Sequence, residues 1–199
     1  MSERQPVPNR TVLSIESGTA YLSLGLTVNG QTFARVLEVG RTAAERLPAE
    51  LEALYAEAAV PMRADVIVVG TGPGSYTGLR VGASYALGLG RAWGVPVLGV
   101  STLEALTGGG DGAVSDRVVP DGVVAVSVDA RKEYVYGAVY RLAGGVVTET
   151  LQPAAKYPFA DFEALASGLP WHRDGAPDPL VLAANGLHHG QREWELAYL

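Results

Sequence analysis

A glycine-rich stretch, GTGPGSYTGLR at residues 70–80, has residue types and spacing that suggest phosphate chemistry. It follows a mostly apolar run, and a glycine loop between a strand and a helix often binds a phosphate through its backbone amides. A P-loop also requires a lysine, which this stretch lacks. The dinucleotide-binding fingerprint requires a third glycine and, about 20 positions later, an acidic residue. Thr77 stands in the glycine's place and no acid occurs between Gly78 and Leu103, so the residues favour a structural turn.

Nucleophile and metal chemistry have little support elsewhere in the chain. The hydrolase pattern G-x-S-x-G is not matched at the glycine loop, where Ser75 stands one place early. Residues 82–86 (GASYA) come closer to the pattern, but they lie inside a predicted helix, whereas the nucleophile of such an enzyme lies at a sharp turn. A metal site on a helix needs histidines at i and i+4, whereas His188 and His189 are adjacent. We expect both to be ordinary surface residues, and we expect no catalytic residue and no metal ligand.

Composition narrows the class of protein further. The chain has 199 residues, 48% of them hydrophobic and 18% charged, so it should bury a core. Its net charge of −6 argues against holding tRNA or DNA by itself, because phosphate binding relies on Lys and Arg. There is no cysteine, no signal-peptide pattern in MSERQPVPNR and no clean apolar stretch that could cross a bilayer, so we expect a cytoplasmic protein without membrane contact.

The elements expected around these residues form the same series twice. In the first half, the sequence predicts three strands at 11–17, 19–28 and 31–39, then a helix at 42–58 and a strand at 65–70. A helix at 78–93, a strand at 96–100 and a short helix at 101–106 are predicted to follow. In the second half, three strands, a helix and a strand are predicted over 123–128, 134–142, 146–151, 160–168 and 180–184. Asn29-Gly30 indicates a type I′ hairpin turn, and Thr42 and Ser101 are predicted helix caps.

Three antiparallel strands, then a helix and a parallel strand, are the layout of a ribonuclease-H-like lobe. Two such lobes in tandem predict an α/β protein of the actin-like, sugar-kinase and heat-shock-protein ATPase superfold, with mixed sheets flanked by helices. We assign residues 1–107 to the N-terminal lobe, 108–122 to a Gly-rich linker or loop, and 123–199 to a smaller, incomplete C-terminal lobe.

The helix after the glycine loop carries small residues on one face. Gly82, Ala86 and Gly90 recur at a spacing of four, and glycine inside a helix costs about 1 kcal/mol relative to alanine. Close approach to another backbone would explain that cost, and the other surface could be the sheet of this chain or a partner helix. Pro73 stiffens the preceding turn, and Thr77 is a candidate cap for the helix.

The segment from Gly72 to Gly82 resembles the signature of the TsaB (YeaZ) family. Two further matches are the stretch 101–106 (STLEAL) and Asp129-Ala130-Arg131 followed by a Val-Tyr strand at 135–136. The ordered matches cover residues 11–140, about two-thirds of the chain, and the remainder matches loosely.

The resemblance implies a non-catalytic scaffold or activating subunit of the bacterial machinery that transfers threonylcarbamoyl to the adenosine beside the anticodon of tRNA. It implies the catalytic relative TsaD and the small ATPase TsaE as partners, a homodimer when the chain is alone, and tRNA contact only through the complex. It implies no cofactor of its own, while ATP or ADP at the interface of the complex is left open.

The resemblance also shifts the preferred role of the helix face from core to interface. The expected interface combines the helix at 42–58 with the helix after the glycine loop: Leu51, Leu54, Tyr55, Gly82, Tyr85, Ala86, Leu89 and Gly90. The motif turn that mounts the second helix consists of Gly72, Pro73, Gly74, Ser75, Thr77 and Gly78.

The first strand departs from the family pattern Asp-Thr-Ser and ends in Glu16-Ser17-Gly18. In an active relative of this fold, Glu16 and Asp129 would face each other across a cleft with Mg-ATP. Glu16, Ser17 and Asp129 therefore define a candidate vestigial nucleotide or magnesium site, against the plainer expectation that the carboxylates are solvated or cap turns. The alternatives left open are a standalone small ATPase or kinase and, with least support, a peptidase.

Overall fold

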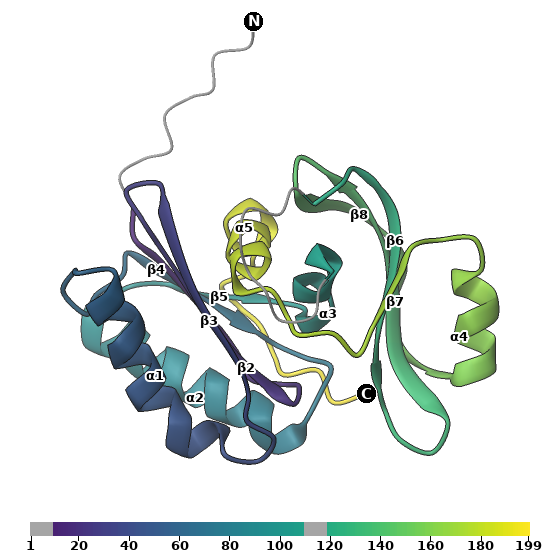
Figure 1. Ribbon diagram of the computed structural model, residues 1–199, viewed down its shortest axis with the longest axis horizontal. Helices are drawn as coiled ribbons and strands as arrows, with labels where there is room; N and C mark the ends of the chain where they lie inside the picture. Colours follow the sequence, from purple (N-terminus) through teal and green to yellow (C-terminus); the bar gives the residue numbers. More distant parts are fainter. Residues whose placement is uncertain (1–9, 110–118) are drawn as a thin grey trace, which may run out of the picture.

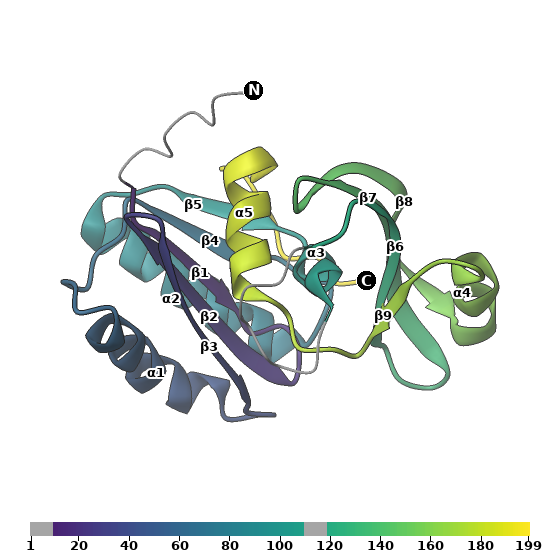
Figure 2. The same ribbon diagram turned by 45° about the horizontal axis from the view of Figure 1, so that its top comes forward.

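The apolar run ahead of the glycine loop forms a central strand of a five-stranded sheet in the computed structural model, which describes residues 10–109 and 119–199 (Figures 1 and 2). The sheet order is β3-β2-β1-β4-β5, with bounds Gln31–Glu38, Tyr21–Val28, Val12–Glu16, Val66–Gly70 and Val97–Val100. β1, β2 and β3 are antiparallel neighbours, whereas β4 runs parallel to both β1 and β5. Asn29 and Gly30 both have positive φ, which confirms the expected hairpin turn.

Helices cover both faces of this sheet. α1 (Ala43–Glu57) and α2 (Tyr76–Trp93) lie on one face, and α5 (Pro179–His189) lies on the other (Figure 1). All five residues of β4 are buried as a result, which explains its nearly continuous apolar sequence. α3 (Thr102–Ala105) and the 3₁₀ turn η1 (Leu106–Gly108) follow β5 and lie between the sheets.

The second sheet repeats the plan of the first with one strand fewer. Its order is β8-β7-β6-β9, with bounds Val146–Pro158, Tyr134–Ala143, Gly122–Asp129 and Trp171–Arg173. β6, β7 and β8 form an antiparallel meander and β9 is parallel to β6. α4 (Phe159–Ala166) covers its outer face, while α3 and α5 pack against its inner face (Figure 1). This confirms the prediction of two tandem α/β lobes with mixed sheets.

One strand was predicted in the wrong place. Residues 180–184 belong to helix α5, and the parallel strand of the second lobe is the short β9, in a stretch where no element was predicted. A short apolar run that is buried on several sides reads alike as a strand or a helix. The helix signal was present: Asp178 accepts hydrogen bonds from the amides of Leu180 and Val181, and Pro179 occupies the first turn.

The C-terminal segment also departs from the assigned lobes. α5 packs on the first sheet, where Leu182 and Ala183 share a cluster with Val66 and Val68. Residues beyond it return to β5, because Gln191 and Gly99 exchange backbone hydrogen bonds. Residues from 178 onward therefore complete the first lobe rather than the second. Of the linker expected over 108–122, residues 110–118 lie outside the described residues.

One of the two predicted caps also differs. Ser101 caps α3 as expected, but Thr42 makes no side-chain cap and instead donates its hydroxyl to the carbonyl of Val39. No helix in the described part of the chain is long and apolar enough to span a membrane.

Candidate functional site

The glycines of the motif turn lie directly against the residues that follow β1. A Cβ on Gly74 would collide with the carbonyl oxygen of Gly18, and one on Gly78 would collide with that of Ser17. A Cβ on Gly82 would lie 2.5 Å from the hydroxyl of Ser17. Gly74 and Gly78 require glycine because their backbone meets the backbone of residues 17 and 18, whereas Gly82 faces a side-chain hydroxyl. The motif is a joint between the start of α2 and the end of β1.

Polar groups of the joint bind one another. The amide of Ser75 donates to the carbonyl of Gly18 at 2.6 Å, and the hydroxyl of Ser17 donates to the carbonyl of Gly78 at 2.8 Å. The Ser75 hydroxyl caps α2 by accepting from the Gly78 amide at 3.3 Å, so the cap is Ser75 and not Thr77. A phosphate cradle presents its amides to a ligand, whereas the Ser75 and Gly78 amides are already bonded within the chain.

Glu16 lies beneath this joint and is fully buried. Its Oε2 accepts a hydrogen bond from the Thr102 hydroxyl at 2.7 Å, and its Oε1 accepts one from the Gly18 amide. The Thr102 hydroxyl in turn accepts from the Gly72 amide at 3.0 Å. Burial raises the pKa of Glu16 above its ordinary value, because these hydrogen bonds offset the loss of hydration only in part. Glu16 thus ties β1 to the glycine turn and to α3.

Glu16 is longer than the aspartate of the family pattern, and the structure has space for the longer side chain. Its Oε2 occupies the space above Gly70, the last residue of β4, where a Cβ would collide with it. The glycine at the end of β4 therefore accommodates the extra methylene.

Asp129 has a different environment from Glu16. It is exposed at the end of β6, where its carboxylate accepts from the Arg131 amide at 2.9 Å and its amide donates to Asp174 at 2.6 Å. Within the described residues, neither a hydrogen bond nor an ion pair joins Asp129 to Glu16 or to Ser17. No group of three or more His, Cys, Asp and Glu side chains suited to a metal ion occurs in residues 10–109 and 119–199.

The small-residue face of α2 packs on the sheet of its own chain, which corrects its assignment to an interface. Six of the eight expected interface residues are buried: Leu51, Leu54, Tyr55, Gly82, Ala86 and Gly90. Tyr85 and Leu89 are partly buried against the same core. A Cβ on Gly90 would lie 2.5 Å from a methyl group of Val97, so β5 sets the close approach.

The outward face of these two helices consists of other residues. On α2 it presents Ser84, Leu87, Gly88 and Arg91, and on α1 it presents Ala49, Glu52 and Ala56. Leu87 is 52% exposed, a large apolar side chain surrounded by small and polar ones. This outward face is the part of the helix pair that a partner could reach.

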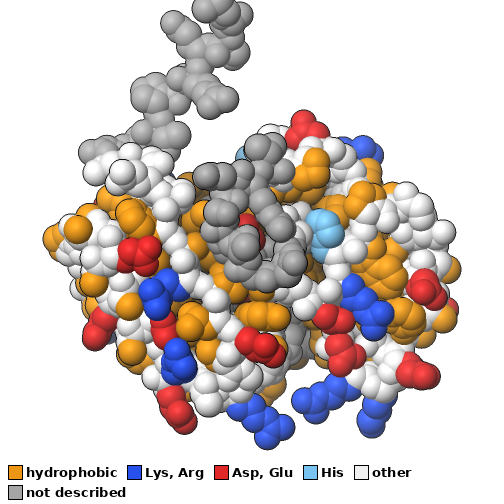
Figure 3. Space-filling view, viewed as in Figure 1, with side chains coloured by type: hydrophobic (Ala, Val, Ile, Leu, Met, Phe, Trp, Pro, Cys, Tyr) orange, Lys and Arg blue, Asp and Glu red, His pale blue; other side chains and the backbone are white. Residues whose placement is uncertain are grey.

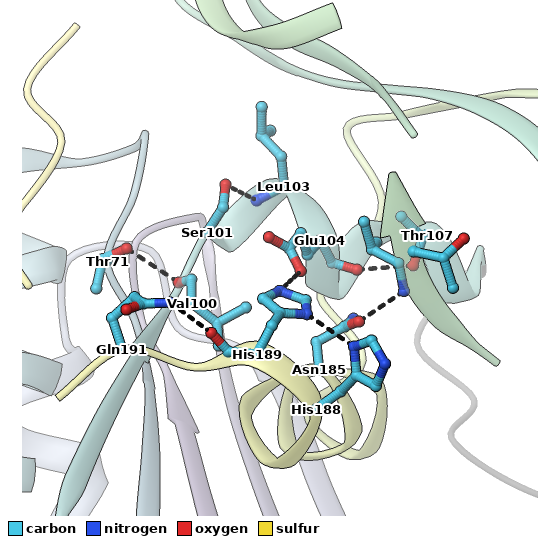
Figure 4. A network of polar contacts seen from close by, with 12 residues as sticks. Thr71, Val100, Ser101, Leu103, Glu104, Thr107, Asn185, His188, His189 and Gln191 are labelled. Atoms are coloured by element: carbon cyan, nitrogen blue, oxygen red, sulfur yellow. Dashed lines mark hydrogen bonds and ion pairs between the residues drawn. The ribbon is translucent and has the colours of Figure 1, made fainter. Parts of the chain in front are cut away.

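A second polar cluster, which sequence reasoning missed, lies where α3 meets α5 (Figure 4). The Nε2 of His189 lies 2.8 Å from Oε2 of Glu104, and this contact raises the pKa of His189. Burial, together with Glu104, raises the pKa of Tyr140 on the second sheet. The adjacent Asn185 is fully buried and accepts from the Val147 amide at 2.8 Å. The expectation that His189 is an ordinary surface residue is therefore wrong, because its side chain is partly buried and pairs with the nearly buried Glu104.

Comparison with known proteins places the chain in a family. Residues 37–187 match the model of the TsaD family, described as tRNA N6-adenosine threonylcarbamoyltransferase. An uncharacterized protein of Mycobacterium tuberculosis strain H37Rv is 35% identical over 189 residues, covering 87% of this chain and 83% of the relative. The Bacillus subtilis tRNA threonylcarbamoyladenosine biosynthesis protein TsaB is 29% identical, over 76% of this chain and 64% of that protein.

Solved structures agree with this placement. YeaZ from Pseudomonas aeruginosa superposes with a TM-score of 0.72 at 26% identity, over 87% of this chain and 88% of that one. A second crystal structure, of a protein described as similar to peptidase YeaZ from the same organism, gives 0.78 at 24% identity, over 96% and 99%. The fold is therefore the actin-like, ribonuclease-H-like fold that the element order predicted.

Proposed function

Because this chain belongs to the TsaB (YeaZ) group of the tRNA N6-adenosine threonylcarbamoyltransferase family, we propose that it takes part in making threonylcarbamoyladenosine in tRNA. Its role in this proposal is that of a non-catalytic subunit that binds and activates the catalytic relative TsaD. Curated relatives named TsaB from Bacillus subtilis, Haemophilus influenzae and Escherichia coli support the pathway.

The burial of Glu16 is the observation that carries the non-catalytic role. A nucleotide-hydrolysing member of this superfold needs a carboxylate at the end of the first strand that reaches a hydrated magnesium ion. Here that carboxylate is fully buried and bonded to Thr102 and Gly18, and the glycine turn next to it contacts residues 17 and 18. The engagement of the Glu16 carboxylate within the chain supports a structural use of the motif rather than nucleotide or magnesium binding.

The surface proposed to bind TsaD is the outward face of α1 and α2. Its small residues permit close approach, and the exposed Leu87 of α2 supplies an apolar anchor. The same face would hold a homodimer when TsaD is absent, so the two assemblies compete. TsaE joins the TsaD pair in this proposal, ATP or ADP binds only at interfaces of the complex, and the complex acts in the cytoplasm.

The direct test supplies TsaD, TsaE, unmodified tRNA and threonylcarbamoyl-adenylate, with and without this chain. Product formation should depend on the chain, and Leu87→Asp should abolish both co-elution with TsaD and stimulation of the reaction. Leu165→Asp, at an exposed leucine of α4 in the second lobe, is the matched control and should leave both unchanged. Product formed equally well without the chain would refute the proposal.

The competing function, a standalone ATPase or kinase, makes a different prediction. The chain alone would turn over ATP, and Glu16→Gln would stop that turnover. We expect no turnover above that of a buffer control, and turnover that depends on Glu16 would instead establish the catalytic alternative.

A further inference from the structure

Two tyrosine rings and an arginine meet at the start of α2. Tyr76 and Tyr198 have ring centroids 5.0 Å apart, and the Arg80 guanidinium lies 3.9 Å from the centre of the Tyr76 ring. The Nε of Arg80 also donates to the Tyr198 hydroxyl at 3.2 Å. Tyr76 is 54% exposed and Tyr198 is 50% exposed, so the group is built on the surface and not in the core.

A second group of the same composition lies on the other lobe. The Lys156 ammonium on β8 lies 5.2 Å from the ring centre of Tyr134 and 5.9 Å from that of Tyr136, both on β7. Tyr134 is 41% exposed. Arg131 and Lys132, which immediately precede β7, are exposed as well.

The two groups are joined into one surface. The Tyr136 hydroxyl donates to the carbonyl of Leu199 at 2.9 Å, and Leu199 follows Tyr198 in the chain. We call this surface the tyrosine platform, and it consists of Tyr76, Arg80, Tyr134, Tyr136, Lys156 and Tyr198. It spans both lobes, and Figure 3 shows Lys and Arg side chains along the lower edge of the molecule.

The cations of the platform differ from four arginines elsewhere in the chain. Arg35, Arg46, Arg141 and Arg173 are paired with carboxylates. Within the described residues, Arg80 and Lys156 contact tyrosines and form no ion pair. Asp129 and Glu133 lie in the turn beside the platform and reduce its net charge, so its attraction for an anion should be modest and sensitive to salt.

We propose that the tyrosine platform binds single-stranded RNA, with bases stacked on the exposed tyrosines and phosphates beside Arg80 and Lys156. Exposed aromatic rings next to cations are the combination that binds unpaired nucleotides, since every base has a face that can stack. The proposal rests on the function proposed above, in which a tRNA is the substrate of the complex. It adds a direct RNA contact by this chain, in spite of its net charge of −6.

The test measures binding of a fluorescent, unstructured oligoribonucleotide of about eight nucleotides to the full chain at low ionic strength, by anisotropy. Tyr76→Ala should weaken binding about 5- to 100-fold, whereas Tyr76→Phe should bind like the parent because stacking is retained. Arg80→Gln and Lys156→Gln should each reduce the slope of log K against log salt by about 0.7. Arg63→Gln is the matched control and should change neither quantity, because Arg63 is an exposed arginine that lies at the far end of α2, where it donates to the carbonyl of Trp93.

Three results would refute the proposal that the tyrosine platform binds RNA. These are no binding by the parent chain, binding by Tyr76→Ala equal to that of the parent, or binding of an abasic oligomer equal to that of the normal oligomer of the same length. Each is independent of the modification assay. A chain that binds RNA through these residues but is dispensable for threonylcarbamoyl transfer refutes only the proposed function. A chain that is required for transfer but fails the binding test refutes only the platform.

Discussion

At the scale of single residues, Glu16 shows how a position that performs chemistry in a fold can become structural. Its carboxylate is removed from water and receives hydrogen bonds from Thr102 and Gly18. Since burial disfavours the charged form, the folded protein holds the proton of Glu16 more tightly than the unfolded chain does.

This difference predicts a dependence of stability on pH. The folded-state pKa of Glu16 lies above 4.5, so its favourable contribution is complete below that value and is lost as the pH rises through the folded-state pKa. Glu16→Gln cannot ionise. The free energy of unfolding of the parent should therefore fall relative to the variant above pH 4.5, by up to about 1.4 kcal/mol per pH unit.

Urea unfolding of both proteins over a series of pH values measures the difference. The raised pKa of His189 is common to both chains, so its contribution cancels in the comparison. Curves that stay parallel from pH 4.5 upward would show that Glu16 has an ordinary pKa in the folded protein.

At the scale of elements, helix α2 has one face on which glycine is needed for close packing and another face on which a larger residue would fit. Gly82 lies toward β1, where a Cβ would meet the Ser17 hydroxyl at 2.5 Å, and Gly88 lies on the outward face with no atom within 4 Å of an added Cβ. The sequence shows both as glycine in a helix interior, and only the packing separates them.

A matched pair of substitutions follows. Gly88→Ala should stabilise the chain by about 0.5–1 kcal/mol, because alanine is the better helix former and has room. Gly82→Ala should destabilise it by about 1–2 kcal/mol, because the methyl group must displace the Ser17 hydroxyl from its bond to Gly78. Thermal or urea unfolding compares the two, and stabilisation by Gly82→Ala would contradict the joint between α2 and β1.

The small-residue stripe on α2 shows where pattern analysis stops. A spacing of four places Gly82, Ala86 and Gly90 on one face, and this part of the prediction is confirmed. Which surface meets that face depends on the sheet, and β5 and the end of β1 meet it here. A bulky residue at Ala86 should therefore disturb the folded monomer before it disturbs any complex.

At the scale of the whole molecule, helix α5 connects the two lobes. Leu182 and Ala183 pack on the first sheet, while Val181 belongs to the cluster on the inner face of the second. The last described residues then run beside β5, where the Trp194 indole donates to the carbonyl of Val97 at 3.2 Å. The first lobe is complete only when the end of the chain has returned to it.

Leu182→Ala tests this arrangement. Leu182 is fully buried on α5, so its truncation should cost about 2–5 kcal/mol and should increase amide exchange in β1 and β4 of the first lobe. Leu187→Ala changes an exposed leucine of the same helix, 46% accessible, and should alter stability by less than about 0.5 kcal/mol. Exchange that rises in the second sheet alone would mean that α5 belongs to that lobe, as first expected.

The candidate site divides in the same way between local and tertiary information. The glycine turn was recognisable as a turn and not a phosphate loop, because lysine and acidic residues are absent from the required positions. The contact of Glu104 with His189 was not recognisable, since no local pattern relates residues that are 85 positions apart.

The sequence alone determined the two meanders, the glycine turn and the small face of α2, because alternation, helical spacing and positive-φ preferences act within a few residues. The motifs in the sequence were also sufficient to identify the family. Only the tertiary structure decided that residues 180–184 are a helix, that Glu16 is buried, and that the small face of α2 meets its own sheet. Burial depends on which surfaces come together, and those surfaces belong to segments far apart in the chain.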